Sequence, residues 1–392
     1  MKRNFMRVCL TVLALSLVFV FAGCNDAGAS GDSDVMNIGM IAPLTGGTAM
    51  FGVAASDGAT LAFEQINAAG GLLDQQVNFR VYDDENSTPM ALQAYERHVY
   101  NNNVVAIVGP VTSGPANAVA GAAQAHGLPM ISPTATAEAV TRGRDFMFRA
   151  CFLDALQARA IAYFAINHLE AETASILYNV GMDYSRGLQE NFTRYFEAMG
   201  GTVIHSLAFS TGDIDFRSQL TTISSGNPDI LFLPEYFSNV GLQIVQARDL
   251  GISATLIGGD GWEGVLDAVP DPAILDGTFF SAHFAPDDPD PIVQNFVRSY
   301  TERFDIAPSS FAALGFDAAN ILAQAIETAG TTERGAVINA MQNIDFYGVT
   351  GNITFDEHGN PIKPIVVVAI STQGGETAAR LYHRFEAEYS FE

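Results

Sequence analysis

"NIGMIAPL" (residues 37–44), "GVAASDGATLAFEQINAAGG" (52–71) and "QVNFRVYD" (76–83) follow one another near the start of the chain. The first and third segments have the residues of short strands. The middle segment has apolar residues at helical spacing and ends at a double glycine. This strand–helix–strand order predicts a βα unit, in which parallel strands form a sheet that helices cover on both faces.

The same alternation extends along the chain in two series. The first series continues to Pro133, and the second runs from about residue 157 to residue 259. Because 392 residues are too many for one typical core, we expect two doubly wound α/β lobes with a hinge near residues 150–156. The other expected strands lie at 104–110, 129–133, 173–180, 202–209, 229–235 and 254–259, and the other expected helices at 88–102, 114–127, 157–169, 183–201, 215–226 and 239–251.

The last third of the chain has a different order. A Pro/Asp-rich stretch at 282–291 comes first and is expected to cross between the lobes. Helices are then expected at 292–305, 309–330 and 334–343, a hairpin at 348–362 and a strand at 364–371. These late elements predict that the chain returns to the first lobe, so that several crossings join the two lobes.

The first 23 residues have the pattern of a secretory signal peptide. A basic segment, "MKRNFMR", precedes an apolar one, "VCLTVLALSLVFVF", and "AGC" places two small residues before Cys24. A cysteine at this point predicts an exported, lipid-anchored protein in the periplasm or at the cell surface, with residues 24–35 as a polar tether. An ordinary cleaved signal is the alternative, because Phe21 stands where a lipobox usually has Leu. No later apolar run reaches the length of a membrane span.

Charge and cysteine content exclude further classes. The net charge is −24, and the signal peptide carries only basic charges, so the rest of the chain repels nucleic acid. Cys9 leaves with the signal peptide and Cys24 is the expected lipid site, so Cys151 has no partner for a disulfide. We expect Cys151 to be buried and inert; a reactive thiol is the alternative.

"LIGGDGWEGV" (256–265) has the G-x-G-x-x-G spacing of a dinucleotide loop at Gly259, Gly261 and Gly264. However, Asp260 lies inside that loop, where its carboxylate would repel phosphates. The residue follows a predicted parallel strand, and α/β sheets place ligand groups at such ends. We therefore expect Asp260 to face a ligand ammonium group; capping of a helix that begins near Trp262 is the alternative.

Two further segments place hydroxyl groups after strands. In "VGPVTSGPANAV" (108–119), Ser113 opens a helix, where free N–H groups bind carboxylates. In "MISPTATAEAV" (130–140), Thr134 and Thr136 lie in the loop after a strand, and small residues there allow a ligand to approach. Ordinary capping of a helix or loop is the alternative for both segments.

The chain resembles the leucine/isoleucine/valine-binding protein family, the type I periplasmic solute-binding proteins of ABC importers. The resemblance rests on an ordered set of motifs and extends from about Asn37 to about Ile370. The family implies two lobes joined by three hinge crossings, with residues 36–154 and 284–365 in lobe 1 and residues 155–283 and 366–392 in lobe 2. The motifs are the stretch at 38–71 that begins "IGMIAPLTGG", "YDDENSTPMAL", "VGPVTSGPA", "PMISPTATA", "DYSRG" and "FDEHGN".

The resemblance also implies a ligand site. Ser113 and Thr136 match the hydroxyls that hold the ligand's α-carboxylate and α-amino groups, and Asp260 matches an acidic position that faces the ammonium group. Val111 and Thr134 would contribute mainly backbone. The aromatic positions are Tyr184 and Tyr236 in lobe 2, and Phe51 and Phe316 in lobe 1. A zwitterion with an apolar side chain, such as leucine, isoleucine or valine, would find a partner for each charged end.

Other functional classes of protein fit the sequence less well than an amino-acid-binding protein. An enzyme is disfavoured because the chain has no H-E-x-x-H or G-x-S-x-G motif and its seven histidines are scattered. Neither a cofactor nor a metal is expected, since "FDEHGN" lacks the ligand set of a calcium loop. The expected partners are a small amino acid and a membrane permease, and a monomer is expected. The alternatives are the same scaffold binding an amide, urea or aromatic acid, or acting as a ligand sensor.

Overall fold

The structure is a computed structural model that describes residues 35–386. The predicted signal peptide, Cys24 and the tether up to residue 34 lie outside the described residues. Within residues 35–386, no helix has both the length and the hydropathy that a membrane crossing requires.

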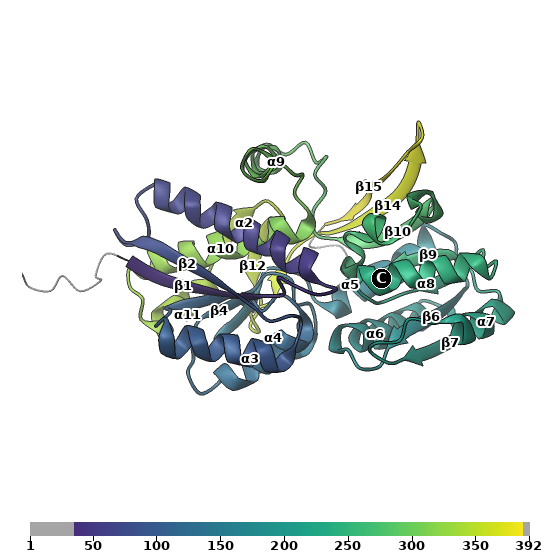
Figure 1. The fold of residues 1–392 in the computed structure, drawn as a ribbon, viewed down its shortest axis with the longest axis horizontal. Coiled ribbons are helices and arrows are strands. Elements are labelled where there is room, and N and C mark those ends of the chain that lie inside the picture. The colour runs from purple at the N-terminus through teal and green to yellow at the C-terminus, as the bar shows by residue number, and fades with distance from the viewer. Residues whose placement is uncertain (1–34, 387–392) are drawn as a thin grey trace, which may run out of the picture. The chain divides into compact units, whose positions relative to one another are not determined.

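Lobe 1 is built on a five-stranded sheet in the order β2 (Gln76–Asp83), β1 (Val35–Ala42), β3 (Ala106–Val108), β4 (Met130–Ser132) and β5 (Met147–Arg149). The pairs β1–β3, β3–β4 and β4–β5 are parallel. Helices α2 (Ala49–Ala68) and α10 (Ser310–Ala329) cover one face, and α3 (Thr88–Glu96) and α4 (Ser113–Ala123) cover the other (Figure 1). The strands β3, β4 and β5 are fully buried, as expected for a sheet covered on both faces.

Lobe 2 is built on a seven-stranded sheet in the order β15 (Glu376–Phe385), β14 (Ile365–Gln373), β10 (Thr278–Ala282), β9 (Thr255–Gly258), β8 (Ile230–Phe232), β6 (Thr173–Asn179) and β7 (Thr202–Phe209). The strands from β10 to β7 pair in parallel, whereas β14 and β15 are antiparallel. The helices of this lobe are α5 (Asp154–Asn167), α6 (Asp183–Ala198), α7 (Arg217–Gly226) and α8 (Phe237–Asp249).

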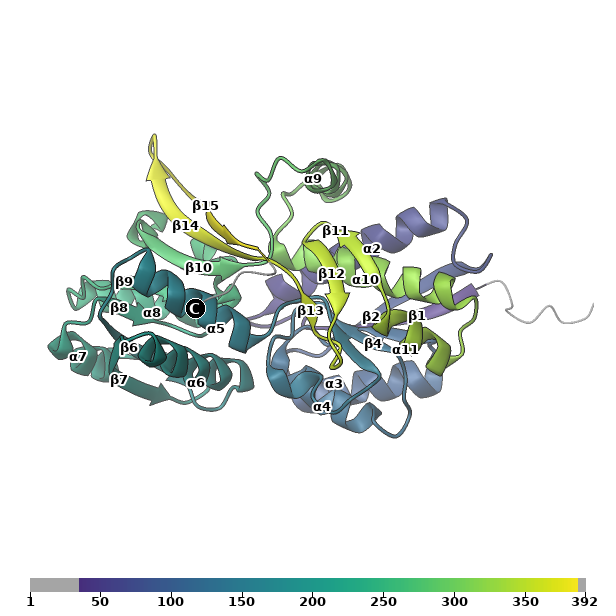
Figure 2. The same ribbon diagram turned by 180° about the vertical axis from the view of Figure 1, so that it is seen from behind.

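The chain passes between the two sheets three times. The first crossing, residues 150–153, joins β5 to α5, and the second, residues 283–290, joins β10 to α9 (Pro291–Phe304). The third crossing, residues 363–364, lies near both of the others. It leads to β14 from a small antiparallel sheet, which consists of β11 (Asp345–Gly348), β12 (Gly351–Phe355) and β13 (Pro361–Ile362). Figure 2 shows this small sheet beside lobe 1 and β14 continuing into lobe 2.

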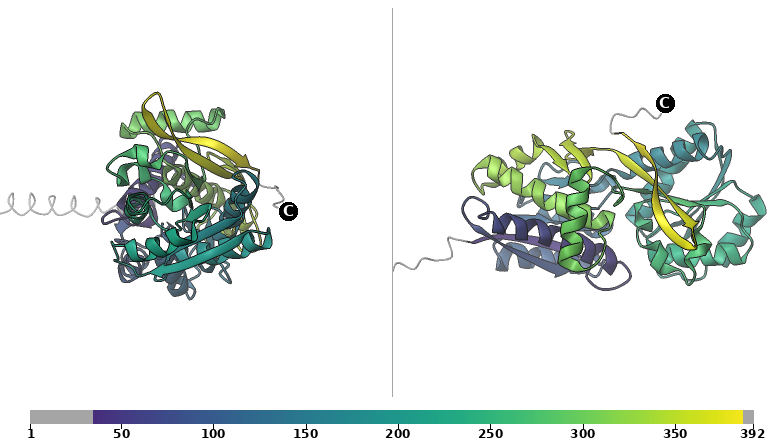
Figure 3. Two further views of the ribbon diagram at one scale, coloured as in Figure 1. Left: turned by 90° about the vertical axis from the view of Figure 1, so that its right-hand side faces the viewer. Right: turned by 90° about the horizontal axis from the view of Figure 1, so that it is seen from above.

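The late helices return to lobe 1. Helix α11 (Arg334–Gln342) packs on α10, and the Phe355 ring of β12 lies 5.1 Å from the Phe148 ring of β5, between ring centroids. The view from above in Figure 3 shows these light green helices beside β1 and α2, with the yellow strands β14 and β15 beside the teal helices of lobe 2. The predicted fold class, two doubly wound lobes joined by three crossings, is confirmed.

Two glycines allow α2 and α10 to pack closely. A Cβ atom at Gly58 would lie 1.9 Å from a backbone oxygen of α10, and one at Gly315 would lie 2.1 Å from a backbone oxygen of α2. Any larger residue would force the helices apart. Their close approach brings Phe51 on α2 and Phe311 on α10 into a parallel stack, with ring centroids 4.2 Å apart.

Four strands, β5, β10, β11 and β15, were not predicted from the sequence; the expected hairpin at 348–362 covers only the last residue of β11. β5 has only three residues, and β10 has five and lies next to the Pro/Asp-rich crossing. β15 is an edge strand whose residues are mostly exposed or half-buried, so it lacks the apolar pattern of a core strand.

Candidate ligand-binding site

The lobe 1 side of the site consists of Ser113, Thr134 and Thr136, called here the hydroxyl wall. Ser113 is the first residue of α4, and the two threonines follow β4. The Ser113 Oγ accepts a hydrogen bond from the backbone N–H of Ala137 at 3.3 Å, and the Thr134 hydroxyl donates to the carbonyl of Val111 at 2.5 Å. These bonds hold the two predicted loops against each other at the carboxyl ends of adjacent parallel strands.

Thr136 differs from its two neighbours. Its side chain is only 1% exposed, and its hydroxyl makes no hydrogen bond of good geometry within residues 35–386, although it lies close enough to the Asp154 carboxyl group to lower the pKa of that group. A buried hydroxyl without a partner is costly, and native structures rarely retain one without a reason. A polar ligand group at this position would provide the missing partner.

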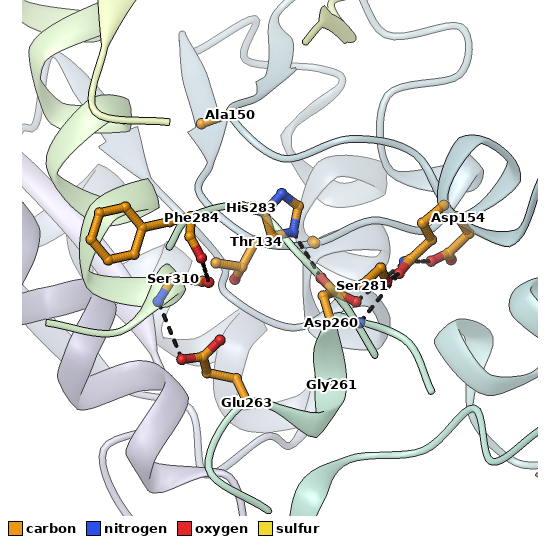
Figure 4. Close-up of polar contacts among 12 residues, drawn as sticks. Thr134, Ala150, Asp154, Asp260, Gly261, Glu263, Ser281, His283, Phe284 and Ser310 are labelled. Carbon is orange, nitrogen blue, oxygen red and sulfur yellow. Dashed lines mark hydrogen bonds and ion pairs between the residues drawn. The ribbon is translucent and has the colours of Figure 1, made fainter. Parts of the chain in front are cut away.

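The lobe 2 side consists of Asp154, Gln157, Tyr184, Asp260 and His283, called here the carboxylate wall. Asp260 is 4% exposed and lies at its centre (Figure 4). Its Oδ1 accepts hydrogen bonds from the Tyr184 hydroxyl at 2.9 Å and from Gln157 Nε2 at 3.2 Å, and its Oδ2 lies 3.0 Å from His283 Nε2. The side chain makes no helix-capping bond, so the capping alternative does not describe it.

The protonation states of its neighbours make them hydrogen-bond donors to Asp260. Burial lowers the pKa of His283 to about 4, so its ring is neutral at pH 7 and donates the Nε2–H to Asp260. Burial likewise raises the pKa of Tyr184 well above its usual value, so the phenol keeps the proton that it donates. An ionised carboxylate has about four acceptor positions. Three donors fill three of them, which leaves room for about one ligand N–H.

Glycines in the 256–265 stretch make room for Tyr184. A Cβ atom at Gly261 would lie 2.8 Å from the Tyr184 hydroxyl, and one at Gly259 would lie 2.6 Å from it. The N–H of Gly261 donates to this hydroxyl at 2.9 Å. The glycine spacing therefore serves the approach of a side chain to Asp260, in keeping with our rejection of a dinucleotide loop.

Aromatic rings lie between the two walls. Tyr236 stacks on Tyr184 with centroids 5.0 Å apart, and it meets the edge of Phe51 at 5.4 Å. Phe51 therefore links lobe 1 to the lobe 2 tyrosines. The α10 aromatic that stacks on Phe51 is Phe311, whereas Phe316 lies against Phe296 of α9.

Trp262, two residues after Asp260, packs in the hydrophobic core of lobe 2. It is fully buried, and its indole N–H donates to the carbonyl of Leu233 at 2.8 Å. Cys151 is also fully buried, and burial raises the pKa of its thiol to about 12. Such a thiol is protonated at pH 7 and is a poor nucleophile.

Sequence reasoning missed three members of the carboxylate wall. Asp154 is 1% exposed, its Oδ1 accepts a bond from Gln157 Nε2 at 2.9 Å, and its Oδ2 has no partner within the described residues. Asp154 fell in the expected hinge, Gln157 at the predicted helix start and His283 in the Pro/Asp-rich stretch. An acid at the beginning of a helix, three residues before a glutamine, was the available signal.

Two polar contacts join the lobes on either side of these walls. Glu263 of lobe 2 accepts a hydrogen bond from the backbone N–H of Ser310, at the start of α10, at 3.4 Å (Figure 4). On the other side, Asn117 of α4 donates to Asp183 of α6 at 3.2 Å. A cavity of about 430 Å³ opens beside the second contact, lined by α4 residues, by Asp183 and by both tyrosines.

Comparisons with known proteins agree with this architecture. The family model described as "Periplasmic binding protein" matches residues 35–376. The Leu/Ile/Val-binding protein BraC3 of Rhizobium johnstonii is 31% identical over 329 residues, covering 83% of this chain and 88% of that protein.

Solved structures give the same result. A leucine-binding protein, LivK, from Thermotoga maritima superposes with a TM-score of 0.84 at 32% identity, covering 90% of this chain and 99% of that one. The Streptococcus pneumoniae protein LivJ, in complex with isoleucine, gives 0.82 at 29% identity, covering 89% and 99%. A Rhodopseudomonas palustris protein in complex with benzoate, at 24% identity and a TM-score of 0.79, shares the fold and covers 88% and 96%. The chain therefore belongs to the periplasmic binding proteins of the Leu/Ile/Val-binding family, which are solute-binding proteins of ABC transporters and not enzymes.

Proposed function

We propose that the protein is a lipid-anchored, exported subunit of an ABC importer that captures an apolar amino acid between its lobes. The observation that carries this proposal is the pairing of two unlike walls across one site. One wall has hydroxyls at the start of α4, and the other has the buried carboxylate of Asp260. A dipolar amino acid offers its carboxylate to the donors of the hydroxyl wall and its ammonium group to the carboxylate of the other wall.

The ligand's carboxylate would lie at the start of α4. There the hydroxyls of Ser113 and Thr136 and the backbone N–H groups of the first turn would bind it. The ammonium group would donate to Asp260, and the apolar side chain would lie against Phe51 and Tyr236. Val111, Thr134, Tyr184 and Phe316 complete the proposed site; the Phe316 ring lies against Phe296 of α9.

Capture would follow from closure of the lobes. Because the ligand contacts both walls only when the lobes are together, binding favours that arrangement over an open one. A membrane permease would then recognise the arrangement with the lobes together. Lipidation of Cys24, the monomeric state and the lobe bounds 36–154 with 284–365 and 155–283 with 366–392 belong to the same proposal; helix α5 and strand β14, both assigned to lobe 2 above, begin at Asp154 and Ile365, one residue before these bounds.

A thermal-shift screen of the common amino acids, benzoate and urea tests the ligand class. Leucine, isoleucine and valine should raise the melting temperature most, since a ligand at 100 times its Kd stabilises the folded state by about 2.7 kcal/mol. Benzoate lacks an ammonium group for Asp260 and should have no effect. If benzoate or urea raised the melting temperature and no amino acid did, the amino-acid assignment would be wrong, but the protein would still be a solute-binding protein.

A further inference from the structure

Asp154 and Asp260 form a pair of buried carboxyl groups that share one amide. Gln157 Nε2 lies 2.9 Å from Asp154 Oδ1 and 3.2 Å from Asp260 Oδ1. The Gln157 Oε1 accepts hydrogen bonds from the Ser281 hydroxyl at 2.8 Å and from the Asp260 N–H at 3.3 Å, which fixes the orientation of the amide. Figure 4 shows Asp154, Asp260 and Ser281 close to one another.

Asp154 lies where it can meet a ligand. Its backbone N–H donates to the carbonyl of Thr136 at 3.0 Å, so it is held next to the hydroxyl wall. Its Oδ2 is buried and unpartnered within the described residues, and the side chain lines a cavity of about 380 Å³. The Thr136 hydroxyl lies beside the Asp154 carboxyl group and lowers its pKa, although neither this hydroxyl nor Asp154 Oδ2 makes a hydrogen bond of good geometry within the described residues.

The charges around Asp154 do not neutralise it. Arg149 is buried nearby, but its guanidinium donates to the carbonyls of Ala135 and Ala137 and to the Thr141 hydroxyl. Two buried carboxylates with no cation between them are unfavourable when both are ionised. The other titratable or charged groups that face Asp154 are Cys151, Tyr184 and Tyr236, and, around the cavity, Glu138, Arg142, Asp183, Arg186 and Glu190.

We propose that Asp154 holds a proton while the site is empty and releases it to water when the ligand's ammonium group enters beside Asp260. The O–H bond of the Asp154 carboxyl breaks, its proton passes to solvent, and the carboxylate then accepts an N–H of the ligand. Charge balances because the entering ammonium replaces the departing proton. This inference rests on the proposed amino-acid ligand.

The electrostatics of the site agree with this exchange. Burial, reinforced by the nearby Asp260 carboxylate, raises the pKa of Asp154 to about 8. At pH 7 the empty protein therefore retains the proton. A cation within about 4–6 Å lowers the pKa of a carboxyl group, so the complex would lose it. At pH 8 about half of the empty protein molecules retain the Asp154 proton, so binding should release about half as much as at full protonation.

Calorimetric titration of the mature protein with L-leucine, L-isoleucine and L-valine tests the proposal. At each pH the titration is repeated in phosphate, imidazole and Tris, and the observed enthalpy is plotted against the ionisation enthalpy of the buffer. The slope gives the number of protons released. We expect about 0.9 proton per ligand at pH 7 and about half a proton at pH 8, where the ligand's own amino group is still protonated.

Two variants identify the residue that releases the proton. Asp154→Asn should bind with a slope near zero at pH 7, because it has no proton to release. Glu190→Gln removes an exposed carboxylate at the edge of the same cavity and should keep the slope of the unmodified protein. A slope that persists in Asp154→Asn would overturn the assignment to Asp154.

The outcomes separate this inference from the proposed function. Binding of an apolar amino acid with a slope of zero at pH 7 in the unmodified protein would overturn the proton exchange and leave the function intact. Failure of every amino acid to bind would overturn both. The buffer series on the unmodified protein decides the question even if Asp154→Asn does not fold.

Discussion

The hydroxyl wall and the carboxylate wall face the same site but are built in different ways. The hydroxyl wall is neutral and comes from two adjacent loops, with the Thr134 hydroxyl bonded to Val111 within lobe 1. The carboxylate wall is charged and comes from segments as far apart as Gln157 and Asp260, separated by 103 positions. A wall of local loops can exist before the ligand arrives, whereas a buried charged network depends on the fold of a whole lobe.

The largest expected effect is that of Asp260→Asn. The amide of the variant carries no negative charge to attract the ligand's ammonium group. Its NH₂ group would also face the donors of Tyr184, Gln157 and His283. We expect affinity for the best amino acid to fall by at least about 100-fold, as for breaking a buried charged pair. Calorimetry measures the change.

The matched control is Asp267→Asn, which removes an exposed carboxylate from the same lobe. It should leave affinity unchanged. Unaltered binding by Asp260→Asn would mean that the carboxylate wall does not recognise the ammonium group.

The second prediction concerns the pH dependence of stability. The folded-state pKa of Asp154 is raised to about 8, from an ordinary value near 3.8, so the folded state binds the extra proton between those values. The raised pKa therefore makes the free energy of unfolding fall as pH rises from about 4 to 8, by up to about 1.4 kcal/mol per pH unit for this group.

Urea denaturation of the ligand-free protein at pH 5, 7 and 9 measures this slope. Asp154→Asn should remove the contribution of Asp154 to this slope. The free energy of unfolding of the variant, relative to that of the unmodified protein, should therefore increase as pH rises. Glu190→Gln again serves as the control. Parallel pH profiles for Asp154→Asn and the unmodified protein would show that Asp154 does not titrate in this range.

Within the hydroxyl wall, Thr136→Val and Thr134→Val should behave in opposite ways. The Thr136 hydroxyl makes no hydrogen bond of good geometry among the described residues, so removing it should cost little stability but weaken ligand binding by about 1–3 kcal/mol. The Thr134 hydroxyl bonds to Val111, so its loss should lower the free energy of unfolding by about 1 kcal/mol.

Denaturation and calorimetry on the same two variants separate these roles. If Thr136→Val lost stability and kept full affinity, Thr136 would be a structural residue and the hydroxyl wall would bind through backbone N–H groups alone.

The smallest expected effect is at the contact that joins the lobes beside the walls. Glu263→Gln keeps the size of the side chain but removes its charge from the N-terminus of α10, where a carboxylate stabilises a helix by about 0.3–1 kcal/mol. Since the contact forms only when the lobes are together, affinity should fall about two- to five-fold. Glu302→Gln on the exposed face of α9 is the control, and equal affinities for both variants would exclude a role for Glu263 in closure.

Much of the hydroxyl wall was predictable because its residues follow strands directly. Ser113 opens α4 and Thr136 follows β4, so local sequence placed both at one edge of a parallel sheet. For Asp260, sequence reasoning predicted the position after β9 but not the neighbours. Phe311 and Phe316 lie on the same predicted helix, and only the packing of α10 against α2 places Phe311 on Phe51.

The sequence by itself determined the two series of βα units and the residues that end their strands, because hydrophobic periodicity and glycine positions act over a few residues. Only the tertiary structure decided which donors surround Asp260. Tyr184, Gln157 and His283 are 76, 103 and 23 positions away from it, and His283 lies at the start of a crossing between lobes. Hydrogen bonds over such separations depend on the order of the strands in the sheet and on the points where the chain crosses between the lobes. No local sequence pattern encodes either of these.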